Sequence, residues 1–528
     1  MMLATMLKVL GLPEDFFIWP LLLVSVILFG AFCLLKPAAA RARLRLDVPT
    51  VTLGWFVPEF VNRLLYSVFA PFLIYRGYEK YKDMPFRILK MDADLIVLPA
   101  RYLAEIRHLP HTKLSLLDAQ FNSVLGDYTN ILNHSHLPAT TVAKKLTPAM
   151  QSPDRIVPKI IDELQYAFPI EVPECKGRWV PVTLYDMILK LINRATSRVI
   201  VGDELCRSEQ WLGTVTSYTH NLGITLILLR PVPTFLRPLV AKFLPSVRYL
   251  ERTLKWVKDD VFVPMIVARR AAQKDNPEAP KPDDFMQWMM ELADNPFDED
   301  PRNIAQGLMV IMALAVLHTS SMLITHALYD LMLHPEYLEP LRAEIQTTLP
   351  DGWINGTQAA FATQRYLDSF LRESQRLNPT SEINIQRIAK EPLVFSDGLI
   401  IPQGTHICFP TGPLSRDGAL LSNPDTFDGF RWCRENLTRT SKTAASLVTI
   451  NQSNLHFGYG RQACPGRFMG ANTAKALLSR LLLEYEMKFE EGRGGRKRPR
   501  NIVNGEQIMP NLWARVLIKK REEEEEEE

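Results

Sequence analysis

The segment with the clearest potential for chemistry is residues 457–467, which read FGYGRQACPGR around a single cysteine, Cys464. The segment has three glycines, which permit positive φ angles and a close approach of the backbone to a flat ligand. An Ala- and Leu-rich stretch from about Phe468 predicts a helix just after the cysteine. The helix dipole and nearby amide N–H groups would stabilise a thiolate there, and a thiolate can bind iron. The alternative is a buried structural cysteine in a glycine-rich turn.

The whole segment resembles the haem-binding loop of the cytochrome P450 family, F-x-x-G-x-R-x-C-x-G. Phe457, Gly460, Cys464 and Gly466 are in register with that pattern. The resemblance implies a haem b cofactor with Cys464 as the iron (metal) ligand. It also implies that Phe457, Gly460, Arg461 and Gly466 contribute to the cofactor-binding site.

One position departs from the family pattern, and it concerns the haem propionates. Gln462 stands where the family usually has an Arg or His that contacts a propionate. Glutamine can donate a hydrogen bond but has no charge, so Arg461 beside it could compensate. Arg387 falls in the strand region from which the family reaches a propionate. Lys145 falls where many relatives have a W-x-x-x-R contact, although a solvated lysine is the alternative there.

A second motif pairs Glu373 with Arg376, which lie three residues apart and therefore on one helical face. By itself such a pair is usually a surface ion pair of little consequence. Its position before the cysteine segment resembles the family's E-x-x-R motif, in which a later arginine joins a buried network. The segment 424–432, PDTFDGFRW, makes Arg431 that third member. The implied role of the triad is structural, beneath the haem.

A third motif lies in a long apolar stretch, where residues 315–320 read AVLHTS. The family has A-G-x-D/E-T at the corresponding place, and there the Thr helps to deliver protons to bound oxygen. Ala315 and Thr319 match, whereas Val316 replaces the glycine and His318 replaces the acid. Thr319 and His318 are therefore the candidate catalytic residues. An imidazole can relay protons near neutral pH, but a hydrogen-bonded core histidine is an equal alternative.

The expected substrate pocket is apolar, which suits a lipophilic ligand. Its candidate residues are Leu308, Met312, Ala315, Val316, Ile385 and Ile508.

The elements that position these residues are mainly helices. Asp300–Pro301 is a typical helix start, and the apolar pattern continues to about Leu333, which predicts one long helix through the core. Asp283–Asp284 predicts the start of another helix. The best strands are 95–98, 399–401 and 406–409. We therefore expect a mainly α chain with the cytochrome P450 fold, a large helical domain with a long central helix and a small domain that contains a β-sheet.

The N-terminal region predicts one transmembrane helix in addition. Residues 16–35 are apolar and uncharged, long enough to cross a bilayer, and basic residues follow them. The positive-inside rule then places the body of the chain in the cytosol, as a single-pass protein of the endoplasmic reticulum membrane. A cleaved signal peptide is the less favoured alternative. The expected organisation is a lumenal N-terminus (1–15), an anchor (16–35), a linker (36–58), a catalytic domain (59–520) and an acidic disordered tail (521–528).

Composition excludes several other classes of protein. The net charge is only +3, and no basic stripe with aromatic residues suggests a nucleic-acid partner. None of the six cysteines forms a C-x-x-C pair, so neither a zinc site nor a redox dithiol is expected.

The resemblance implies an enzyme that inserts oxygen from O₂ into a lipophilic small molecule. Electrons would come from NADPH through NADPH-cytochrome P450 reductase. Other segments resemble filamentous-fungal members that oxidise secondary metabolites, so a terpenoid is the first choice of substrate, and a sterol or fatty acid is an alternative. The changes at Val316 and His318 also leave open a haem-thiolate isomerase or dehydratase that does not activate O₂. A non-catalytic haem or membrane scaffold is a third possibility.

Overall fold

A computed structural model describes residues 46–153, 155–438, 446–490 and 497–522. The described residues from Val48 onwards belong to one compact unit. The expected membrane segment, 16–35, and residues 1–15 lie outside the described residues, as does 523–528 of the expected tail. The expected linker, 36–58, overlaps the compact unit, because Thr50–Val51 forms strand β1 and pairs in parallel with β2.

Helices make up most of the described chain, as expected. The α-helices are α3 (Glu59–Lys80), α4 (Leu103–Ile106), α5 (Leu116–Ser123), α6 (Gly126–Thr129), α7 (Leu137–Thr141), α8 (Thr147–Gln151), α9 (Val157–Glu171), α10 (Leu184–Ile200), α11 (Glu209–Leu229), α12 (Arg237–Phe243), α13 (Pro245–Trp256), α14 (Val263–Asp275), α15 (Phe285–Leu292), α16 (Pro296–Glu299), α17 (Pro301–Met309), α18 (Leu317–Leu333), α19 (Leu338–Thr348), α20 (Gln358–Thr363), α21 (Arg365–Leu377), α22 (Thr411–Ser415), α23 (Arg431–Thr438) and α24 (Arg467–Glu484). The short 3₁₀ and π segments are η2 (Ala100–Tyr102), η3 (Val142–Leu146), η4 (Val257–Phe262), η5 (Val310–Val316), η6 (Pro335–Tyr337), η7 (Trp353–Asn355) and η8 (Gly460–Gln462).

The strands form one mixed sheet and three small ones. The six-stranded sheet has the order β1-β2-β3-β9-β6-β4, with β2 (Phe86–Leu89), β3 (Asp94–Val97), β4 (Leu114–Ser115), β6 (Asn384–Ala389) and β9 (His406–Phe409). The small sheets are β10-β13-β5 (Tyr485–Phe489, Arg515–Lys520, Val180–Thr183), β11-β12 (Ile502–Asn504, Gln507–Met509) and β7-β8 (Leu393–Val394, Ile400–Ile401).

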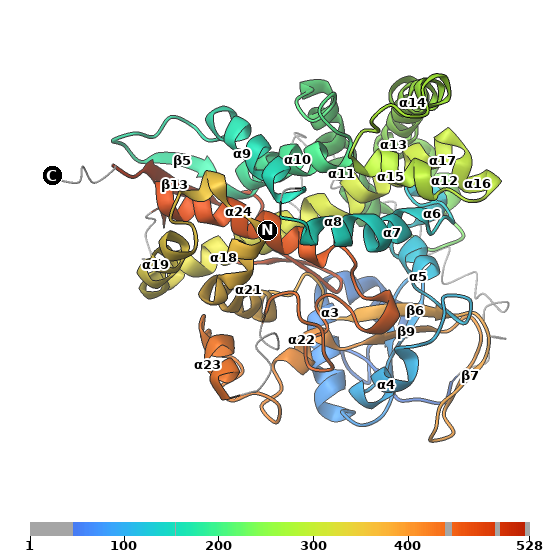
Figure 1. Ribbon diagram of the computed structural model, residues 1–528. Helices are drawn as coiled ribbons and strands as arrows, with labels where there is room; N and C mark the ends of the chain where they lie inside the picture. The colour runs from blue at the N-terminus through green and yellow to red at the C-terminus, as the bar shows by residue number, and fades with distance from the viewer. Residues whose placement is uncertain (1–45, 154, 439–445, 491–496, 523–528) are drawn as a thin grey trace. The chain divides into compact units, whose positions relative to one another are not determined.

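The three expected strands are present as β3, β8 and β9. Although β8 and β9 follow each other in the chain, they belong to different sheets: β8 pairs with β7, and β9 lies between β3 and β6. Figure 1 shows β6 and β9 with α3 and α4 in one part of the unit, and helices such as α9, α10, α11 and α13 in the other. This arrangement matches the expected division into a large helical part and a smaller part with the sheet.

The expected long helix runs from Pro301 to Leu333 as α17, η5 and α18. The Asp300 carboxylate caps its start by accepting from the Arg302 N–H at 2.8 Å, and Pro301 fits the first turn because it lacks an N–H. Within the described part of the chain this is the one helix long and apolar enough to cross a bilayer. It is largely buried and packs against α10, α21 and α24, so it is the core helix of the fold.

Candidate active site

The cysteine segment forms a tight loop that ends at α24. The Cys464 N–H donates to Phe457 O at 2.7 Å, which closes the loop. Gly458 and Gly460 have φ angles of +76° and +71°, a conformation that side chains rarely adopt. A Cβ atom at Gly460 would also lie only 2.5 Å from Arg107 O. Glycine is therefore required at position 460 both by the backbone conformation and by the contact.

The Gly460 contact docks the loop on the chain just after α4. The Arg461 N–H donates to Arg107 O at 3.0 Å. On another side, Thr147 Oγ1 donates to Pro465 O at 2.9 Å, which ties the loop to the start of α8. The loop is thus held by segments far away in the sequence.

The thiol of Cys464 is enclosed by protein but borders open space. Burial raises its pKa, whereas the N–H groups of Gly466 and Arg467 donate to the sulfur and lower the pKa. The residue nevertheless keeps exposed surface. A thiol with a raised pKa stays protonated in the free protein, and a bound metal ion would deprotonate it. Amide donors on one side and open space on another are what a sulfur ligand to a metal ion would need.

The core helix also has exposed surface in its middle. Ala315 and Thr319 are exposed although they lie between buried neighbours such as Leu317 and Ser320. They are one turn apart, and Thr319 Oγ1 donates to Ala315 O at 2.7 Å. These two residues therefore face an open space inside the fold.

The exposed stretch coincides with a π-helical distortion, η5. At its end the Leu317 N–H donates to Met312 O, five residues back, so the helix is locally widened. The distortion forms although Val316 stands where the family has glycine.

The cysteine loop and this stretch of the core helix are joined through α24. A Cβ atom at Gly470 would lie 3.8 Å from Ser320 Oγ, next to Thr319, and α24 packs along α18 (Figure 1). The cysteine loop and the motif at 315–320 therefore meet at two neighbouring helices, α24 and α18, although Cys464 and Ala315 are 149 positions apart in the sequence.

His318 lies beside Thr319 but is directed toward α10. Its Nδ1 is 2.6 Å from the Tyr185 hydroxyl, and the two rings are parallel within 4°. Burial lowers the pKa of His318 to about 4, with a smaller contribution from His220. The imidazole is therefore neutral at physiological pH. These contacts match the alternative of a hydrogen-bonded core histidine, and its role in proton transfer remains a prediction.

Arg387 reaches the cysteine loop from β6. Its guanidinium donates to Gln386 O at 2.8 Å and to Gln462 O at 3.3 Å. In the part of the chain that the structure describes, no carboxylate forms an ion pair with it, and burial lowers its pKa to about 10. A buried cation without a counter-ion is costly. An anionic group of a ligand would satisfy it.

Gln462 itself does not point toward such a ligand. Its Nε2 donates to Leu114 O at 3.0 Å, so the side chain ties the loop to β4. Gln462 therefore helps to dock the cysteine loop on β4 and supplies no charged contact.

The structure brings Glu373, Arg376 and Arg431 together in a buried network. Arg376 donates to both Glu373 oxygens at 2.8 and 2.9 Å, and Arg431 Nε lies 3.3 Å from Oε1. Glu373 is 0% exposed, and Trp432 Nε1 donates to it at 3.1 Å. The arginines also donate to backbone carbonyls, including Ser415 O and Ser422 O. The carboxylate thus holds α21 against the start of α23.

Two of the predicted cofactor-binding residues, Lys145 and Arg461, have other surroundings than those predicted. Lys145 Nζ donates to Glu291 at 3.0 Å, and the Arg461 side chain is exposed, so neither shows a contact that supports a cofactor role. Four of the predicted pocket residues are fully or almost fully buried: Leu308, Met312, Ile385 and Ile508. Ala315 and, partly, Val316 keep accessible surface.

Other residues of the site were not predicted from the sequence. Tyr185 was missed because nothing in its surroundings marks it as the partner of His318. Asn384 was missed too, although its Nδ2 donates to Leu455 O at 2.8 Å and His456 O at 3.0 Å, directly before the cysteine loop. Arg107 contributes only its backbone, for which sequence carries no signal.

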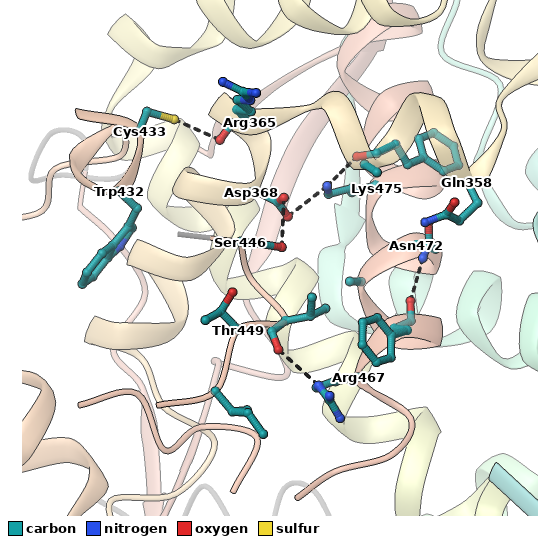
Figure 2. Close-up of a pocket in the computed structure, with 16 residues that line it drawn as sticks. Gln358, Arg365, Asp368, Trp432, Cys433, Ser446, Thr449, Arg467, Asn472 and Lys475 are labelled. Atoms are coloured by element: carbon teal, nitrogen blue, oxygen red, sulfur yellow. Dashed lines mark hydrogen bonds and ion pairs between the residues drawn. The ribbon is translucent and has the colours of Figure 1, made fainter. Parts of the chain in front are cut away.

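A surface pocket of about 560 Å³ lies behind the cysteine loop, between α20, α21 and α24. Figure 2 shows Arg467 at its edge, where Nε donates to Val448 O at 3.2 Å. The same side chain donates from Nη1 to Cys464 O at 2.7 Å. Asp368 and Lys475 form an ion pair of 2.9 Å on the pocket's other wall. Arg467 therefore connects the outer surface with the backbone of the predicted iron ligand.

The residues around Cys464 fit a haem. The Cys464 thiol and the exposed Ala315–Thr319 stretch border open space on neighbouring helices. Arg387 adds a buried cation that lacks an anionic partner among the described residues. A flat, dianionic macrocycle with a metal ion would account for all three features.

Known proteins are similar to this chain over most of its length. Residues 130–509 match the family model described as Cytochrome P450. The cytochrome P450 monooxygenase penP of Penicillium crustosum is 45% identical over 506 residues, 96% of this chain and 95% of its own length. The cytochrome P450 monooxygenase AtmP of Aspergillus flavus is 44% identical over 503 residues, 95% and 94% of the two chains. The cytochrome P450 monooxygenase paxP of Penicillium paxilli is 43% identical over 511 residues, 96% of each chain.

Proposed function

This chain belongs to the cytochrome P450 family, and on that premise we propose that it is a monooxygenase acting on a lipophilic secondary metabolite, with a terpenoid as the first choice. The observation that carries the proposal is the Cys464 thiol, which borders an interior space next to amide donors at the start of α24. Three similar fungal proteins are named as monooxygenases, which supports the same reaction class.

The chain's own residues would hold the cofactor as follows. Cys464 would ligate the iron, and the N–H groups of Gly466 and Arg467 would stabilise the negative charge on sulfur. Arg387 would neutralise a propionate. Haem held in this way supplies the activation of O₂ and the transfer of one oxygen atom to the substrate.

Thr319 and His318 would handle protons. The Thr319 hydroxyl is exposed toward the interior space and donates to Ala315 O, so its oxygen can accept a hydrogen bond from a water molecule there. His318 is neutral, and Tyr185 occupies its Nδ1, which leaves Nε2 to exchange a proton. A neutral imidazole relays a proton by taking one up at one nitrogen and releasing one from the other, so a relay through His318 would use Nε2 and the Tyr185 hydroxyl at Nδ1.

We expect the electrons to come from NADPH through a cytochrome P450 reductase. The surface pocket behind the cysteine loop supports a docking place for it, because Arg467 lies at its edge and contacts Cys464 O.

We also propose that the chain is held at the endoplasmic reticulum membrane by residues 16–35. Exposed apolar residues support contact of the folded part with lipid: Phe235, Leu239 and Phe243 are 55%, 58% and 70% exposed and recur every four residues around α12. The tagged chain should remain in the microsomal pellet after an alkaline carbonate wash. Release into the supernatant would contradict an integral anchor.

The reaction can be tested in the native host and in the purified system. Deletion of the gene should make a precursor accumulate that is lighter than the missing product by one oxygen atom, as measured by mass spectrometry. Incubation of that precursor with the purified chain, reductase, NADPH and ¹⁸O₂ should restore the product with one ¹⁸O. Turnover without O₂ and NADPH would instead identify the isomerase or dehydratase alternative.

The role of Arg387 predicts weaker haem retention in the Arg387→Gln variant. Loss of a charge-assisted hydrogen bond of about 1.5–3 kcal/mol corresponds to haem transfer to apomyoglobin that is faster by roughly 10- to 100-fold. Arg387→Lys, which keeps the charge, should lose less. The matched control is Arg342→Gln, because Arg342 is also a buried arginine that donates to carbonyls, Leu482 O and Tyr485 O. Equal haem loss in Arg387→Gln and Arg342→Gln would contradict the assignment.

A further inference from the structure

A buried carboxylate, Glu506, sits at the turn of the β11-β12 hairpin. It is 4% exposed, although turn residues usually face solvent. Oε2 accepts from the Tyr66 hydroxyl at 2.9 Å, and Oε1 lies 3.5 Å from Lys90 Nζ. Burial by itself raises the pKa of Glu506, but Lys90 and Arg230 outweigh burial and lower the pKa to about 2. The group is therefore a buried anion at the place where the chain reverses.

The partners of Glu506 come from three separate elements. Tyr66 belongs to α3, and Lys90 follows directly after β2. Arg230 follows the end of α11, where it is 6% exposed and donates to Ser123 O at 2.6 Å. One carboxylate thus fastens the hairpin to α3 and to the chain after β2, and the positive charge of Arg230 at the end of α11 also stabilises it.

The backbone of the same turn supports the chain that leads to the cysteine loop. The Glu382 N–H donates to Glu506 O at 2.8 Å, and the Ile508 N–H donates to Thr380 O at 3.3 Å. Four positions beyond Thr380, Asn384 donates to the carbonyls that precede the cysteine loop. Arg387, in the same strand, donates to Gln462 O in the loop itself.

The segment between the hairpin and the loop is strained. Ile385 has a φ angle of +54°, which is rare for a β-branched residue; it costs on the order of 1–3 kcal/mol and persists only where the surroundings impose it. The strand pairing of β6 with β9 also shifts register between Asn384 and Arg387. Such a conformation requires fixed supports at both ends, and the hairpin is one of them.

The base of the hairpin is fixed as firmly as its turn. Arg498 Nε lies 2.6 Å from Asp330 Oδ1 in α18, and Asn501 Nδ2 donates to Asn378 Oδ1 at 2.9 Å. The hairpin is therefore held at two points by buried polar groups and acts as a rigid support.

We propose that Glu506 is a positioning residue, which through its contacts with Tyr66 and Lys90 holds the hairpin and thereby sets the segment Thr380–Arg387 beside the cysteine loop. The inference rests on the proposed function and deepens it: Glu506 sets the size of ligand that the interior space accepts, while Cys464 sets the chemistry. Loss of the Glu506 carboxylate should therefore change which small molecules fit, and Cys464 should remain bound to the iron.

The test uses the full-length holoprotein and two iron-binding probes, imidazole and the bulky azole clotrimazole. Glu506→Gln keeps the shape and removes the charge. Clotrimazole affinity, from the Soret shift on titration, should fall by roughly ten-fold, and imidazole affinity should change less than about two-fold. The reduced carbon monoxide spectrum should keep the thiolate signature.

The matched control is Asp284→Asn. Asp284 is likewise buried, at 4% exposure, and pairs with Arg269 at 2.7 Å, but it caps α15 and contacts neither the hairpin nor the 380–387 segment. Asp284→Asn should lower the melting temperature, but it should leave the ratio of the clotrimazole and imidazole affinities unchanged. If Glu506→Gln does not fold, Tyr66→Phe removes only one hydrogen bond and should shift the ratio in the same direction by about two- to three-fold.

An unchanged ratio in both Glu506→Gln and Tyr66→Phe would overturn the inference while leaving the proposed function intact. A wild-type protein without a thiolate spectrum would instead overturn the proposed function itself.

Discussion

Replacement of Cys464 by histidine should remove the thiolate signature from the reduced carbon monoxide spectrum and replace it with that of an imidazole ligand. Turnover should fall by more than about 10³-fold, which corresponds to roughly 4 kcal/mol in the activation barrier. The physical reason is that a thiolate donates electron density to the metal and so favours cleavage of the O–O bond, whereas a neutral imidazole donates less. The Soret band and product formation are measured on the same preparation.

Cys433 offers a matched control for this substitution. It is the other described cysteine with accessible surface, and its sulfur contacts Arg365 O at 3.0 Å near the surface pocket (Figure 2). Cys433→Ser should keep both the thiolate spectrum and most of the turnover. If Cys464→His retained the thiolate spectrum, the iron ligand would have to be another cysteine.

The Glu373→Gln variant should be the most destabilised of the single substitutions considered. Both Arg376 and Arg431 would lose the one carboxylate that pairs with them in the described part of the chain, in a place where water cannot replace it. Breaking one partner of a buried pair typically costs about 3–5 kcal/mol, because it leaves an uncompensated buried charge. We expect a melting temperature several degrees lower, or no recovery of folded haem protein at all.

The control for Glu373 has the same spacing but a different environment. Glu339 and Arg342 also lie three residues apart on one helix, at 2.6 Å, but the Glu339 side chain is 76% exposed. Glu339→Gln should therefore cost less than about 1 kcal/mol. Equal melting temperatures for the two variants would show that the buried network does not stabilise the fold.

Local patterns were enough to predict the long helix and the glycine-rich loop, whereas the buried triad was predicted from the family resemblance. The Asp300–Pro301 start and the continuous apolar run determine where the core helix begins and how deeply it is buried. The positive φ angle of Gly460 follows from the glycine itself. For these features the chemistry of neighbouring residues is sufficient.

Pairings between distant residues could not be predicted in the same way. Strands 399–401 and 406–409 were predicted from the sequence, but their partners were not: β8 pairs with β7, and β9 pairs with β3 and β6. Neither the contact of His318 with Tyr185 nor that of Glu506 with Lys90 has a local signal. The substrate pocket stays a prediction, because helical periodicity does not distinguish a helix face that lines a ligand from one that packs in the core.

The way the cysteine loop is docked has a consequence for how the protein is made. Gln462 donates to Leu114 O, a carbonyl 348 positions earlier in the sequence, and Gly460 lies directly on Arg107. Contacts of such high sequence separation form slowly and only after the intervening chain has been translated. The loop can therefore reach its final conformation only near the end of synthesis. Haem binding should accordingly be a late step, and it should report on the correct folding of almost the entire polypeptide.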